Sequence, residues 1–79
     1  MEVIVHSTLS SVGGQVTVAT DPNQRVDSLI TAFCMEKNIQ HRHNYILRDR
    51  DQQVLDNMHT LSAAKVYNGD ILFLGIRGK

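Results

Sequence analysis

The sequence predicts an α+β domain in which a mixed sheet of four to five strands wraps around one helix. Apolar and polar residues alternate near the N-terminus, which is the period of a strand, whereas the apolar residues of a later segment recur at helical spacing. A last aliphatic run follows a tight turn near the C-terminus. The chain has 79 residues. A single domain of this size needs nearly every large apolar side chain in its core.

The first two predicted strands form a β-hairpin. Met1, Val3 and Val5 occupy every second position, as expected of a half-buried strand. After a loop rich in serine and glycine, residues 15–20 alternate again and include β-branched side chains. Two such runs joined by a loop predict antiparallel pairing.

A helix follows the turn that Asp21 and Pro22 predict. Its apolar positions recur at spacings of three and four residues and are Val26, Leu29, Ile30 and Phe33. Asparagine tolerates positive φ, so Asn38 is a suitable left-handed end for the helix, and Ile39 would pack back beneath it. One face of this helix should therefore cover the sheet.

The second half of the chain predicts the remaining strands. Residues 45–47 form a third strand, and residues 54–55 form a short edge strand. Residues 60–66 form a brief helical turn. The Asn-Gly pair at 68–69 is a strong turn signal, and the last strand, residues 71–74, begins directly after it.

This order of elements is that of the β-grasp fold, and the chain resembles ubiquitin over essentially its whole length. The shared local motifs are Asp21-Pro22, Thr60-Leu61-Ser62 and Ile76-Arg77-Gly78. The chain is also similar to the YukD family, the small bacterial ubiquitin-like proteins linked to type VII secretion. Their final turn commonly reads Gly-Asp before aliphatic residues, as Gly69-Asp70 does here. One fold hosts many functions, so the resemblance alone does not decide what the chain does.

Strand alternation also predicts an apolar patch on the outward face of the sheet. Residues taken to face the helix are Met1, Val3, Val5, Tyr45, Leu47, Ile71 and Phe73. The resemblance to ubiquitin implies that partners bind this outward face, with Ile46, Leu74 and Leu9 at the main recognition points. The predicted partner-binding patch comprises Ile4, Leu9, Ile46, Leu72 and Leu74. The alternatives are an alternation that slips by one residue, or ordinary apolar surface with no partner.

The C-terminal residues suggest a second mode of action. The predicted domain spans residues 1–74, and residues 75–79 form a flexible tail. The resemblance to ubiquitin implies a conjugation tail of Ile76, Arg77 and Gly78, with Gly78 as the reactive end once a peptidase has removed Lys79. Glycine suits that role because a residue without a side chain threads easily into a narrow catalytic site. The alternative is a frayed terminus without a function.

Two functional hypotheses follow from the resemblance. In the first, the chain is the precursor of a protein modifier that an activating enzyme and a conjugating enzyme attach to targets through Gly78. In the second, it is an interaction module that is never conjugated, as in the YukD family, and binds components of a secretion system or another assembly. Self-association through the sheet face is a further expectation under the second hypothesis.

Composition excludes several other classes. Eight basic and eight acidic residues cancel, so the chain has no overall field to hold nucleic acid. No apolar run approaches the length of a membrane span. The single cysteine and the absence of a secretory signal indicate the cytoplasm.

The sequence predicts no enzyme, cofactor or metal site. His41 and His43 lie two residues apart, but a metal site needs further ligands that the nearby sequence does not supply. Cys34 lies on or beside the apolar face of the helix and has no evident partner base, which indicates a buried structural thiol.

Overall fold

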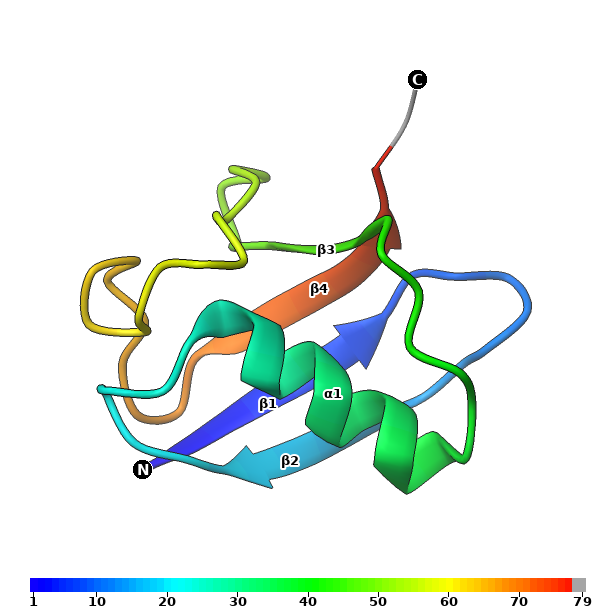
Figure 1. The fold of residues 1–79 in the computed structure, drawn as a ribbon, viewed down its shortest axis with the longest axis horizontal. Coiled ribbons are helices and arrows are strands. Elements are labelled where there is room, and N and C mark those ends of the chain that lie inside the picture. The colour runs from blue at the N-terminus through cyan, green and yellow to red at the C-terminus, as the bar shows by residue number, and fades with distance from the viewer. Residues whose placement is uncertain (78–79) are drawn as a thin grey trace.

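In the computed structural model, which describes residues 1–77, one helix packs across a four-stranded mixed sheet (Figure 1). The elements in chain order are β1 (Glu2–Ser7), β2 (Gln15–Ala19), α1 (Val26–Lys37), β3 (Tyr45–Arg48) and β4 (Ile71–Ile76). The predicted α+β class is confirmed, including the single helix and the mixed sheet. Within residues 1–77, no helix has the length and apolar character needed to cross a membrane.

The strands lie in the order β2-β1-β4-β3. β1 pairs antiparallel with β2 and parallel with β4, and β3 pairs antiparallel with β4. The first and last strands of the chain are therefore the two central strands, and β2 and β3 are the edges.

Helix α1 follows the predicted pattern closely. Its buried residues are Val26, Leu29, Ile30, Phe33 and Cys34. The helix ends at Asn38 with φ 57°, so the predicted left-handed end is confirmed. At the other end, the amides of Val26 and Asp27 donate to the carbonyl oxygens of His59 and Asn57, at 2.9 and 3.0 Å. These bonds satisfy amides that a helix start otherwise leaves without partners.

The turn before β4 fixes the register of that strand against β1. The Asn68 side chain accepts a hydrogen bond from the Glu2 amide at 2.7 Å, and the Gly69 amide donates to the Glu2 carbonyl at 2.7 Å. Gly69 has φ +87°, which glycine adopts without strain. From there Ile4 pairs with Ile71, and the parallel ladder continues along both strands.

The side chains of β4 face the opposite way from the prediction. Leu72 is 1% exposed and Leu74 is 0% exposed, and both belong to the core beneath α1, whereas Ile71 is 40% exposed. The register explains the error, because Leu72 lies beside Val5, which faces the helix. The placing of Leu72 and Leu74 in the outward patch was wrong.

The last strand also extends beyond the predicted domain boundary at residue 74. Gly75 and Ile76, predicted to begin a flexible tail, continue β4 and pair with β3. The Arg77 amide then donates to the Asn44 carbonyl at 2.7 Å. Gly78 and Lys79 lie outside the described residues.

The predicted short strand at residues 54–55 is a single bridge between Arg48 and Val54. Beside it, the Leu55 amide donates to the Leu47 carbonyl at 2.9 Å. These contacts lie on the outer edge of β3, so this side of the sheet is covered by the segment that follows the strand.

Candidate protein-binding surface

The face of the sheet opposite α1 gathers side chains from β1, β3 and β4, since cross-strand partners point to the same face. The register places these residues together on it: Ile4, His6, Ile46, Arg48, Ile71 and Phe73. We call this set the outer face.

Three apolar side chains, Ile4, Ile71 and Phe73, lie on the two central strands of the outer face. The ring of His6 lies beside them. Ile71 is the most exposed of the three at 40%, and Ile4 and Phe73 are half-buried. The rings of His6 and Phe73 meet edge to face, with centroids 6.0 Å apart and planes at 81°, an arrangement that aromatic pairs favour. The central strands thus present a partly exposed apolar surface held in place by ring packing.

Ile46 points to the predicted face but is covered. It is 2% exposed and does not belong to the core cluster beneath the helix. Its partner across the ladder is Gly75. A Cβ added at Gly75 would lie 3.1 Å from Nη1 of Arg48 and 3.5 Å from Oγ1 of Thr8, so these two side chains occupy the space that the glycine leaves open. Arg48 and Thr8 therefore cover the outer face beside Ile46, and the prediction that Ile46 is an exposed recognition point was wrong.

Leu9 does not join the outer face. It is half-buried and packs against the core cluster. Its amide donates to the Ser7 hydroxyl oxygen at 3.1 Å, which holds the start of the first hairpin loop against the sheet. Among the five residues of the predicted patch, Ile4 alone is both on the outer face and partly exposed.

Sequence reasoning missed Ile71, Phe73 and His6. Residues 71–74 are all apolar, so the run itself carries no alternation that distinguishes its two faces. The available signal was indirect: the assignment of Val5 to the core constrains β4 once the parallel register is known. That register depends on contacts between distant segments.

His41 and Cys34 occupy structural positions. His41 Nε2 lies 3.2 Å from Oδ1 of Asp27, so the pair joins the loop after α1 to its first turn. Burial raises the pKa of the Cys34 thiol, and the nearby Asp27 carboxylate raises it further. A raised pKa keeps the thiol protonated and unreactive at neutral pH. Within residues 1–77, no group of three or more side chains is arranged to hold a metal ion.

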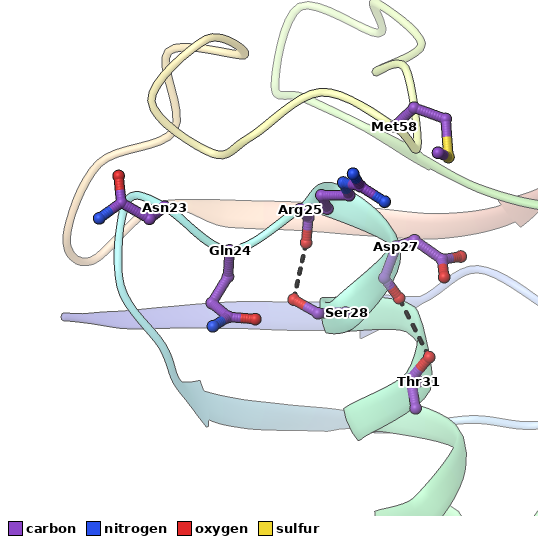
Figure 2. Close-up of a pocket in the computed structure, with 7 residues that line it drawn as sticks. All are labelled: Asn23, Gln24, Arg25, Asp27, Ser28, Thr31 and Met58. Atoms are coloured by element: carbon purple, nitrogen blue, oxygen red, sulfur yellow. Dashed lines mark hydrogen bonds between the residues drawn. The ribbon is translucent and has the colours of Figure 1, made fainter.

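An open hollow lies at the N-terminal end of α1 (Figure 2). Its lining residues are Asn23, Gln24, Arg25, Asp27, Ser28, Thr31 and Met58. The Ser28 hydroxyl donates to the Arg25 carbonyl at 2.7 Å, and the Thr31 hydroxyl donates to the Asp27 carbonyl at 3.2 Å. Because these donors serve the local backbone, the hollow offers few groups aimed at a ligand. It is a weaker candidate site than the outer face.

Comparison with known proteins identifies the fold. No protein-family model matches the chain, and no curated protein matches its sequence. In contrast, 303 chains of known structure match. The architecture and these matches show that the chain has a ubiquitin-like β-grasp fold, which confirms the predicted fold.

One of the matching structures can be compared with this chain in detail. Described as "Molecular Mimicry of SUMO promotes DNA repair", it superposes with a TM-score of 0.84 over 96% of this chain and 90% of that chain. The two sequences are 16% identical. Identity this low shows a shared fold and leaves function open. The resemblance to the YukD family stays a prediction.

Proposed function

We propose that this chain is a protein-interaction module whose partner binds the outer face of the sheet. The observation that supports this most directly is Ile71, a large aliphatic side chain that is 40% exposed on a central strand. Phe73 and Ile4 lie beside it and remain partly accessible. Large apolar side chains grouped on a surface mark contact sites for other proteins.

The surroundings of this group suit a protein partner. His6 and Arg48 lie at its margin on the same face, so apolar residues are flanked by polar ones, as in protein interfaces generally. The resemblance to ubiquitin implies the same face for partner binding. The similar solved structure is described by the words "Molecular Mimicry of SUMO", and mimicry of another protein is a binding role, which supports binding rather than catalysis as the class of function.

A paired substitution tests the proposal. Ile71→Glu places a charge in the proposed contact, and Met58→Glu is the matched control because Met58 is 63% exposed and lies in the hollow beside α1. Each purified variant is used as bait in extract of the native cell. We expect Ile71→Glu to lose partners that Met58→Glu retains. Equal recovery by both variants would contradict the proposal.

A second candidate function is the protein modifier conjugated through Gly78 after removal of Lys79. Its support is the order Ile76-Arg77-Gly78, which resembles the end of ubiquitin. An activating enzyme, a conjugating enzyme and a processing peptidase would be its partners.

Conjugation through Gly78 would require the end of β4 to separate from β3. The chain is held to β3 through Ile76 and by the Arg77 amide on Asn44. An extended residue spans only about 3.5 Å. Gly78 follows the last held residue directly, so its carboxyl group could enter a narrow enzyme site only if the end of β4 were released. This favours the form that binds without conjugation, such as an adaptor of a secretion complex.

The intact mass of the protein and its adducts from the native cell separates the two forms. Loss of one lysine residue together with Gly78-linked polypeptides would establish the modifier. Full-length, unlinked protein alone would support the module that is never conjugated. Gly78→Ala is the matched control, since it should abolish any linkage and leave binding by the outer face intact.

A further inference from the structure

The two edges of the sheet differ in what covers them. The β3 edge is covered by the bridge from Arg48 to Val54 and by the bond from Leu55 to Leu47. β2 is the opposite edge, and among residues 1–77 no strand lies on its outer side (Figure 1). The β2 edge is therefore open to pairing.

Backbone groups of β2 point outward in a regular pattern. Met1 and Thr20 exchange both of their backbone bonds, at 2.9 and 2.8 Å. In an antiparallel ladder such pairs alternate with pairs that do not bond each other. The next bonded residues of β2 are thus Val18 and Val16, and the free groups belong to Gln15, Thr17 and Ala19.

The open edge also lacks the features that prevent pairing. Proteins protect an edge with charged residues, proline or bulges. β2 reads Gln-Val-Thr-Val-Ala and contains neither a charge nor a proline. It can therefore accept another extended strand along its length.

We propose that a second copy of this chain occupies the edge, with the two β2 strands antiparallel and centred on Thr17. This register places Thr17 opposite itself and Gln15 opposite Ala19 of the second copy. All three residues have outward backbone groups, so the pairing forms about six new backbone bonds. The arrangement has two-fold symmetry, the commonest form of homodimer.

Charge complementarity favours a second copy over an unrelated strand. A Cβ added at Gly14 would lie 2.8 Å from Nζ of Lys37, so this ammonium group lies directly beside the start of β2, and Glu36 lines the groove further along the strand. Asp21 is exposed just after the other end of the strand. In the register centred on Thr17, Gly14 lies opposite Thr20 of the second copy. Lys37 of each copy then lies next to Asp21 of the other.

The helix adds a contact of small side chains on the side of the sheet that it covers. Ser28 and Ala32 line the hollow between α1 and β2, and Glu36, four residues further along the same stripe, lines the groove beside the start of β2. In the two-fold arrangement the two helices run antiparallel on one side of the joined sheet, where Ser28 and Ala32 permit a close approach.

A charge swap tests the dimer. The mass of the 79-residue protein is measured by sedimentation across a range of concentrations. We expect a monomer–dimer equilibrium that Lys37→Glu or Asp21→Lys weakens about tenfold, since two equivalent ion pairs are replaced by repulsion. The double variant should recover the wild-type equilibrium. Arg50→Glu is the control, because Arg50 is exposed in the loop after β3 at the opposite edge.

Amide hydrogen exchange provides a second readout that does not depend on the ion pairs. The amides of Gln15, Thr17 and Ala19 should become protected as concentration rises, while those of Val16 and Val18 are protected throughout. A monomer at every concentration, with these three amides unprotected, would overturn the proposal. Protection that appears only when a different protein is added would also overturn it and would assign the edge to another partner. The outer face tested above lies elsewhere, so either proposal can fail alone.

Discussion

The two faces of β4 give neighbouring apolar residues opposite roles. Leu72 and Leu74 are buried against α1, whereas Ile71 and Phe73 lie on the outer face. All four are large and apolar, so hydrophobicity does not distinguish them. The register against β1 decides which residue stabilises the fold and which is available to a partner.

The largest expected effect on stability is that of Leu74→Ala, on the buried face of β4. Leu74 is 0% exposed in the core. Leu74→Ala removes buried methyl groups and leaves a cavity, so we expect a loss of about 2–5 kcal/mol in the free energy of unfolding. Denaturant titration followed by circular dichroism measures it. A loss well below 1 kcal/mol, on the scale expected for a surface position, would show that the face assignment is wrong.

Ile46 provides an intermediate case, because it lies on the outer face but is 2% exposed. Ile46→Ala should lower the free energy of unfolding by about 1.5–3 kcal/mol, which is the transfer free energy of a buried aliphatic side chain without the cavity term expected in the core. The same denaturant titration measures this loss. Arg48→Ala should lower it less and should expose Ile46. If Ile46→Ala proved as mild as Ile71→Ala, the covering by Arg48 would be disproved.

The pH dependence of stability tests whether Cys34 is buried between the helix and the sheet. Its pKa is raised above the ordinary value of 9.0, mainly by burial. The unfolded thiol therefore loses its proton at lower pH than the folded one. The stability that this group contributes is complete below pH 9.0 and is lost as pH rises towards the folded pKa. Urea titrations from neutral to alkaline pH measure the free energy of unfolding. This free energy should fall more steeply with rising pH in the wild type than in Cys34→Ala. Equal declines would contradict burial of the thiol.

The smallest expected effect on stability is that of Ile71→Ala. The side chain is already 40% exposed, so we expect a change below about 1 kcal/mol in the free energy of unfolding. Binding of the native partner should nevertheless weaken, which separates this residue from Leu74. Calorimetric titration with the recovered partner measures the affinity. A variant that unfolds easily while binding normally would reverse the roles assigned to the two faces.

Much of the fold could be predicted from local patterns. Helix α1 was found because Leu29, Ile30 and Phe33 recur at helical spacing, and its end was found because Asn38 tolerates positive φ. Val3 and Val5 alternate strictly and were correctly assigned to the core. In each case the signal lies within a few residues of the structure that it specifies.

The candidate site was harder to predict because it depends on contacts between distant segments. The faces of β4 follow from the turn at Asn68 and Gly69 pairing with Glu2, near the other end of the chain. The covering of Ile46 requires Arg48 and Thr8 to fill the space above Gly75. Neither contact has a signature in a local stretch of sequence.

Site-specific photo-crosslinking in the native cell tests the central claim most directly. A photoreactive residue is placed at position 71 on the outer face, and a matched one at position 58 beside α1. Met58 is 63% exposed against 40% for Ile71, so exposure alone favours position 58. We expect discrete crosslinked species from position 71 and none of them from position 58. The same species from position 58, with none from position 71, would contradict the assignment of the outer face as the partner-binding surface.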